Sequence, residues 1–202
     1  AGLQDQVLSG LSVLSPDGRT PQQALAEIRA SVLGLTAQQS ALWRDQLCPA
    51  LAAEGILIAG VENATDIERA ELESVFTRQI FQVLTPLAVG PGQPFLYISG
   101  LSLSLGLLVR DPEAGEERFA RVKVPEGLDR FVDIGPRGLR IPLENVIAHF
   151  LDHLFPEMDI AERVAFRLTR DGETEISDDA DDLLEAVESE VQKRRFGSVV
   201  RV

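Results

Sequence analysis

The sequence predicts an α+β protein in which a helical N-terminal segment is followed by a mainly antiparallel sheet packed with helices. Two observations carry this prediction. Apolar residues recur at three- and four-residue steps between Leu25 and Leu42, which is helical spacing. Leucines and valines alternate with other residues between Leu101 and Val124, which is the spacing of half-buried strands.

The first long helix is predicted to begin at Thr20. Thr20 can cap the helix, Pro21 suits its first position, and Gln23 can close a capping box. The apolar stripe that follows contains Leu25, Ile28, Val32, Leu35 and Leu42. We expect this helix to end between Pro49 and Gly55 and to pack against other helices.

A second capping box, Thr65 to Glu68, predicts another helix that ends at Thr85–Pro86. Its apolar stripe contains Leu72, Val75, Phe76, Ile80, Val83 and Leu84. Residues 90–94 predict a stiff Gly/Pro loop. Short strands are expected at residues 56–58 and 131–134.

Two strands joined by a hairpin loop at Asp111–Gly115 are predicted next. On the second strand, Ala120, Val122 and Val124 form one face, and Phe119, Arg121 and Lys123 form the other. A helix over 143–154 and a strand over 163–168 follow. A last helix, capped by Ser177 and ending in Lys193–Arg195, has acids at its start and bases at its end, as the helix dipole favours.

The composition restricts the classes of partner. The chain has 202 residues, 45% of them hydrophobic, with a net charge of −13. Such a charge repels nucleic acid, so none is expected as a partner. Cys48 is the single cysteine, and the start has no secretory signal, so we expect a cytoplasmic protein. No apolar run is long enough for a transmembrane segment, and both ends indicate a piece of something longer.

Several residues are candidates for chemistry. His149 and His153 are four apart and can share a metal, but no third ligand is evident, and an exposed polar helix face is the favoured interpretation. The acidic run from Asp171 to Asp182 lacks the order of an EF-hand, so a solvated turn and helix start is expected. Residues 100–104 fall short of a nucleophile elbow because Ser104 replaces its second glycine. The sequon at Asn63 is better explained by Thr65 as a helix cap.

The cations between residues 118 and 123 are the best candidate anion patch. Arg121 and Lys123 share one strand face, with Arg118 nearby, and Arg163 and Arg167 from another strand can join them. Such a cluster is able to contact phosphate oxygens. A solvated sheet face with local ion pairs is the favoured interpretation of these residues taken by themselves.

Taken in order, the segments resemble polyphosphate kinase of the histidine-phosphoenzyme type. The matching phrases are QIFQVLTPLAVGPGQPFLYISGLSLSL, RFARVKVPEGLDRFV, IPLENVIAHFLDHLFP, AFRLTRDGE and DLLEAVESEVQKRRFGSVVRV. The resemblance implies that residues 1–55 are the end of the N-terminal helical domain and residues 56–202 most of the head domain. Gly100 and Ser104 stand where asparagines are expected, which puts side-chain hydrogen bonds there in doubt.

The resemblance further implies a non-catalytic fragment, with the phosphate-accepting histidine and the groups that bind ATP and magnesium elsewhere in the parent. No catalytic residue, bound cofactor or metal is therefore expected in this chain, and isolated it should have no kinase activity. The implied partners are the parent's catalytic domains, a second copy through the head domain, and polyphosphate and ATP in the parent. Arg121 and Lys123 are the candidate phosphate contacts.

Two other hypotheses stay open at this point. One is a free-standing acidic α+β module that binds other proteins. The other is a small metalloenzyme that depends on His149 and His153.

Overall fold

The computed structural model describes residues 2–11, 13–88, 98–170 and 199–202. The chain divides into two compact units, residues 1–50 with 170–200 and residues 51–169 with 201–202, and each is described by itself. The predicted Gly/Pro loop at 90–94, the acidic run and the last helix at 177–195 lie outside the described residues. In the described part, no helix is both long and apolar enough to cross a bilayer.

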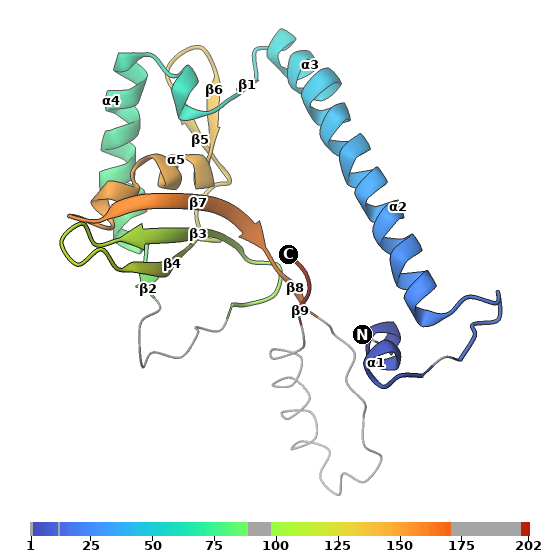
Figure 1. Ribbon diagram of the computed structural model, residues 1–202. Helices are drawn as coiled ribbons and strands as arrows, with labels where there is room; N and C mark the ends of the chain where they lie inside the picture. Colours follow the sequence, from blue (N-terminus) through green and yellow to red (C-terminus); the bar gives the residue numbers. More distant parts are fainter. Residues whose placement is uncertain (1, 12, 89–97, 171–198) are drawn as a thin grey trace, which may run out of the picture. The chain divides into compact units, whose positions relative to one another are not determined.

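The first unit is dominated by one long helical run, shown in blue in Figure 1. The unit begins with the short helix α1 (Gly2–Leu8). The long run consists of α2 (Pro21–Leu42), the π-helical turn η1 (Trp43–Leu47) and α3 (Cys48–Ala53), and the end of α3 belongs to the second unit. The capping box is present: Gln23 N donates to Thr20 Oγ1 at 3.2 Å, and Thr20 N donates to Gln23 Oε1 at 2.9 Å. The predicted start of the helix is thus confirmed.

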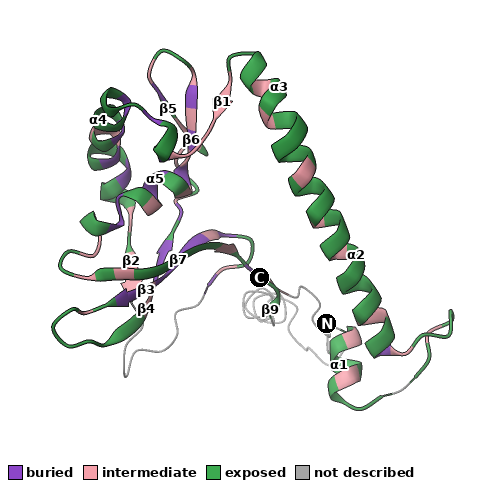
Figure 2. Cartoon of the chain, turned by 45° about the horizontal axis from the view of Figure 1, so that its top comes forward, coloured by how far each residue is buried: buried purple, intermediate pink, exposed green. Residues whose placement is uncertain are grey.

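The apolar stripe of α2 differs from the prediction in its burial. Leu25 and Val32 are half-buried, while Ile28 and Leu35 expose 51% and 64% of their surface. Among the described residues of α2, Pro21 alone is buried, and Figure 2 shows the helix mostly in the colour of exposed residues. Helical spacing therefore identified the helix correctly. As expected, α2 packs against another helix, α1, but most of its apolar stripe stays exposed in the described part.

The second unit contains two sheets. A small sheet has the order β1-β6-β5, with β1 (Leu57–Ile58) parallel to β6 (Leu139–Pro142) and β5 (Phe131–Ile134) antiparallel to β6. An antiparallel sheet has the order β2-β4-β3-β7, and its strands are β2 (Pro86–Ala88), β4 (Glu117–Lys123), β3 (Leu103–Arg110) and β7 (Asp159–Arg167). A separate two-stranded sheet pairs β8 (Thr169–Arg170) with β9 (Val199–Arg201). The α+β class and the mainly antiparallel sheet are confirmed.

Short helices cover one face of the antiparallel sheet. They are η2 (Val61–Asn63), α4 (Asp66–Val75), the π-helical turn η3 (Phe76–Ile80), η4 (Phe81–Val83), α5 (Leu143–His149) and η5 (Leu151–His153). Alternate residues of β3 and β4 enter the core below them, as predicted. These strand residues are Leu105, Leu107, Val109, Ala120, Val122 and Val124.

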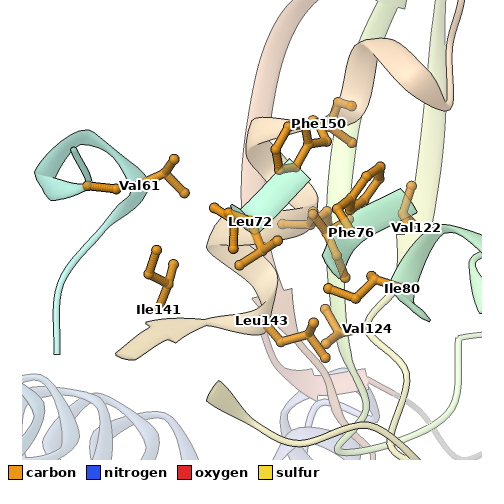
Figure 3. Close-up of a cluster of buried hydrophobic side chains, with 14 of the residues drawn as sticks. Val61, Leu72, Phe76, Ile80, Val122, Val124, Ile141, Leu143 and Phe150 are labelled. Carbon is orange, nitrogen blue, oxygen red and sulfur yellow. The ribbon is translucent and has the colours of Figure 1, made fainter. Parts of the chain in front are cut away.

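Phe76 lies at the centre of this core (Figure 3). It is fully buried, and its ring stacks on Phe150 with centroids 4.6 Å apart. The core therefore joins α4 and η3 to the segment after α5 and to the antiparallel sheet. This packing fixes the position of strands β3 and β4 relative to the helices.

An ion pair between the buried carboxylate of Glu68 and the part-exposed side chain of Arg137 fixes the start of α4. The capping box is again present, with Thr65 N donating to Glu68 Oε2 at 2.8 Å. Arg137 Nε donates to the other carboxylate oxygen at 2.6 Å, and Arg137 Nη2 donates to the Asn63 carbonyl at 2.7 Å. These donors, Arg137 first, lower the pKa of Glu68 to about 2. Gly135 has φ +67°, and a Cβ there would overlap the Glu68 carboxylate, so glycine suits this close approach.

The strand β7 contains a register shift opposite Leu108 and Val109. Leu108 pairs with Glu162, whereas Val109 pairs with Ile160, so Ala161 is the extra residue of a β-bulge. Ile160 and Arg163 are three residues apart, so regular alternation would place their side chains on opposite sides of the sheet. Because of the bulge, both lie on the helix-covered side, and Ile160 faces the core beside Val109. The predicted strand over 163–168 is present as β7, but it begins earlier, at Asp159, and ends at Arg167.

Candidate phosphate-binding face

Arg121 and Lys123 lie on the face of the antiparallel sheet that is turned away from the helices. Arg121 pairs with Leu87 on β2 and with Gly106 on β3, and Lys123 pairs with Ser104. Because directly paired residues of a sheet point to the same side, the two cations share one face, as the alternation on β4 predicts. Neighbouring residues on β4, Ala120 and Val122, point into the core.

Arg121 is buried, with 6% of its surface exposed. Its Nε donates to the Oγ of Ser104 at 3.1 Å, and Ser104 itself is fully buried. Desolvation lowers the pKa of the Arg121 guanidinium, because burial disfavours the charged form. Gly100 and Ser104 stand where the resemblance leads one to expect asparagines, which puts side-chain hydrogen bonds at both positions in doubt. At Ser104 such a bond is present.

Lys123 is the accessible cation beside Arg121. Its side chain is 45% exposed, and Nζ lies 2.9 Å from Glu126 Oε1. The hydrogen bond from Lys123 lowers the pKa of Glu126. An exposed pair of this kind contributes little stability, so Lys123 can exchange Glu126 for a ligand anion at small cost.

Two phenyl rings flank the backbone beside Arg121. A Cβ at Gly106 would stand 3.2 Å from the Phe166 ring and 3.3 Å from the Phe119 ring. Gly106 therefore lets both rings lie close over the centre of the sheet. The candidate site is a buried guanidinium and an exposed ammonium, two residues apart, on a face that also carries aromatic rings.

The arginines expected to join this face do not lie on it. Arg163 pairs with Leu107 and Arg167 with Leu103, and Leu107 points into the helix-covered core. Both arginines are therefore on the side opposite Arg121, and this part of the prediction was wrong. Arg118 also lies on that opposite side, opposite Val109, and pairs with Glu116 at 2.7 Å. Alternation within a strand gives the faces of that strand, but matching faces between strands requires the register.

His149 and His153 do not share one helical face. The helix α5 ends at His149, Phe150 adopts φ −104° and ψ 26°, and His153 belongs to the 3₁₀ turn η5. Each ring instead contacts phenyl groups edge-on: His149 with Phe150 at 4.8 Å, and His153 with Phe76 at 5.6 Å between centroids. The predicted continuous helix over 143–154 is thus interrupted, and the spacing that suggested a shared metal is lost.

Of the remaining candidates, Ser104 is an interior strand residue rather than part of a strand-to-helix turn. Thr65 caps α4, as predicted. In the ranges that the structure describes, no three histidine, cysteine or carboxylate side chains converge as the ligands of a metal ion would. The Glu68–Arg137 pair was missed, since its partners are 69 residues apart in the sequence and nothing local signals their contact.

Two family models together match most of this chain. The model for the polyphosphate kinase middle domain matches residues 67–202, and the model for the polyphosphate kinase N-terminal domain matches residues 1–59. Both describe successive domains of a single kind of protein. The chain therefore belongs to the polyphosphate kinase family.

Curated relatives agree over the whole chain. Polyphosphate kinase from Mycobacterium ulcerans (strain Agy99) is 45% identical over 213 residues, and that from Thermosynechococcus vestitus is 46% identical over 211 residues. Each alignment covers 100% of this chain and 29% of the relative. The chain thus spans less than a third of the length of these relatives.

A solved structure shows the same fold. The crystal structure of polyphosphate kinase from Porphyromonas gingivalis superposes with a TM-score of 0.69 at 22% identity, covering 85% of this chain and 29% of that chain. At this identity the likeness supports the arrangement of helices and strands rather than any residue's role.

Proposed function

We propose that this chain is a non-catalytic part of a polyphosphate kinase, whose parent enzyme transfers the γ-phosphate of ATP to polyphosphate through a phosphohistidine. The observation that carries the proposal is that this chain matches two successive domain models, the N-terminal and the middle domain of polyphosphate kinase. The chain covers only 29% of a relative named polyphosphate kinase. The division at residue 55 between a helical domain and a head domain belongs to the same proposal.

Magnesium, and ATP as the phosphoryl donor of the reaction, are assigned to the parent enzyme and not to this chain. Phosphoryl transfer needs cations placed around the migrating group and, in this reaction, a histidine nucleophile. The described residues hold no converging set of metal ligands, and the rings of both histidines lie against phenyl groups. No step of the phosphoryl transfer is therefore proposed for a residue of this chain.

The role that remains is support of the active site, of the polyphosphate path and of a dimer interface. The catalytic domains of the parent are its expected partners, together with a second copy through the head domain. Cytoplasmic location is part of the proposal and is supported by the single cysteine, Cys48. Lys123, with Arg121 beneath it, is the proposed contact to polyphosphate oxygens.

Two measurements test the proposal. The 202-residue chain is incubated with ATP, magnesium and a polyphosphate primer, and polymer growth is followed; no growth is expected, and turnover by this chain alone would refute the proposal. Then Lys123→Glu is placed in the full-length parent, where we expect weaker affinity for polyphosphate by several-fold with ATP affinity unchanged.

A matched control is available on the same sheet. Arg110→Glu makes the same change of charge at the far end of β3, where Arg110 pairs with Glu117. We expect this control to bind polyphosphate normally. Equal affinity in the Lys123→Glu and Arg110→Glu enzymes would remove the proposed contact while leaving the assignment of the chain to the kinase in place.

A further inference from the structure

A cationic cleft lies on the other side of the antiparallel sheet from Arg121 and Lys123, among the short helices. It has a volume of about 550 Å³, and its walls come from η2, α4, α5 and β7. The size is in the range of small-molecule sites. Arg69 and Arg163 both line it, together with the amide of Asn145 and the imidazole of His149. These residues come from three separate parts of the sequence.

Both arginines are held in place by backbone carbonyls. Arg163 Nη1 donates to the Ala148 carbonyl at 2.7 Å, and Arg69 Nη2 donates to the Glu62 carbonyl at 3.3 Å. A guanidinium has five N–H donors, so these bonds orient each side chain and leave further donors for a ligand. Within the described residues, no carboxylate oxygen lies within 4.0 Å of Arg163, whereas Arg69 has Asp66 at 3.5 Å.

We propose that this cleft binds a phosphate group of a small ligand. Each planar guanidinium can donate two N–H bonds to a pair of oxygens of the tetrahedral phosphate, and the opposite charges strengthen these bonds relative to those with a neutral ligand. Asn145 and His149 add donors on the same wall. The site is independent of the face with Arg121 and Lys123, because Arg163 lies on the opposite side of the sheet.

One residue of the cleft, Glu62, carries a negative charge that repels a bound anion, so its replacement should change phosphate affinity in the opposite direction to replacement of an arginine. Glu62 also lines the cleft, and its carboxylate lies so close to Gly60 that a Cβ there would overlap it. A negative charge near the ligand weakens the binding of a phosphate. Replacing Glu62 by glutamine should therefore strengthen binding, whereas replacing either arginine should weaken it.

The experiment is calorimetric titration of the 202-residue chain at low ionic strength with three probes: inorganic phosphate, tripolyphosphate and ATP. We expect Arg163→Gln and Arg69→Gln each to weaken binding by about tenfold, as for the loss of a charge-assisted contact. Glu62→Gln should tighten binding about twofold to fivefold. Arg167→Gln is the matched control, since Arg167 lies on the same strand and the same side of the sheet.

The outcomes separate the ligand sources and decide the proposal. Equal binding of tripolyphosphate and ATP indicates a phosphate chain as the ligand, and tighter binding of ATP indicates a nucleotide; both support the site. No binding of any probe overturns it. Unchanged affinity in Arg163→Gln, or an equal loss in Arg167→Gln, also overturns it, because binding would then reflect general charge. Circular dichroism of each variant verifies that the fold is retained.

Discussion

The helices α2 and α4 begin with the same sequence signature but end in different surroundings. Each starts with a threonine capping box, Thr20 with Gln23 and Thr65 with Glu68, and each carries an apolar stripe at helical spacing. The stripe of α4 and η3 is buried under the sheet, with Leu72 and Phe76 fully inaccessible. The stripe of α2 is largely exposed in the described residues. The comparison teaches that capping and spacing determine where a helix forms, whereas the rest of the fold determines whether it is buried.

The largest expected effect is on the buried side of this comparison. Phe76→Ala removes a ring that stacks on Phe150 and leaves a cavity, so we expect a loss of about 3–5 kcal/mol in the free energy of unfolding. Urea denaturation followed by circular dichroism measures it. Leu35→Ala on α2 is the control, with an expected change within about 0.5 kcal/mol. Similar losses in the two variants would contradict the contrast.

A smaller effect is expected at the capping box of α4, where Glu68→Gln removes the charge that Arg137 contacts. The folded-state pKa of Glu68 is about 2, below its ordinary value of 4.5. Its contribution to stability is therefore present above pH 4.5 and is lost as the pH falls toward 2. We expect Glu68→Gln to lower the melting temperature by several degrees at pH 7.

The pH series supplies the control for this variant. Because the wild-type carboxyl becomes protonated in acid, the difference between the two proteins should shrink progressively below pH 4.5. Thermal melts at matched ionic strength measure it. A difference that stays constant down to pH 2 would show that the charge of Glu68 is not what matters.

The two caps themselves give a more even comparison. Thr20→Ala and Thr65→Ala each remove an acceptor for the backbone N–H three residues later. Each substitution should cost about 1 kcal/mol, as is typical of N-caps. The Thr65→Ala substitution should lower the free energy of unfolding somewhat more than Thr20→Ala, because the Thr65 hydroxyl also donates to Glu68 Oε2 at 2.9 Å. Chemical denaturation of both variants tests this, and a larger loss at Thr20 would reverse the expected order.

The smallest effect is expected on the exposed stripe. Leu35→Gln should change the stability of this chain by no more than about 0.5 kcal/mol, because the residue is already 64% exposed. The same substitution in the full-length parent measures whether other domains cover α2. A clear loss of stability there, with none in the 202-residue chain, would show that α2 is buried only in the assembled enzyme.

Local signals account for most of what the sequence predicted correctly. The starts of α2 and α4 depend on contacts three residues apart, and β5 spans the predicted residues 131–134. The faces of β3 and β4 follow from simple alternation. On the candidate face, the shared side of Arg121 and Lys123 was predictable for the same reason.

Long-range contacts account for what was missed. The strand β2 is three residues long and shows no alternation, so its pairing with β4 defines it. In β6, the buried residues Leu139 and Ile141 alternate with Arg140 and Pro142, but four residues are too short a pattern to predict a strand. The placement of Arg163 away from Arg121 depends on the register between β3 and β7. The end of α5 at His149 reflects the backbone of Phe150, which the spacing of the apolar residues did not indicate.

The extra residue Ala161 has a consequence for how the length of β7 can vary. Removing Ala161 joins Ile160 directly to Glu162, and regular alternation then keeps Ile160 opposite Val109 and Glu162 opposite Leu108. Removing Val164 instead would shift the alternation by one residue, so the side chains of Arg163 and of the β7 residues before it would point to the opposite face of the sheet. A one-residue deletion should therefore be tolerated at Ala161 and harmful three positions later, so homologous chains of different length are expected to differ at the bulge.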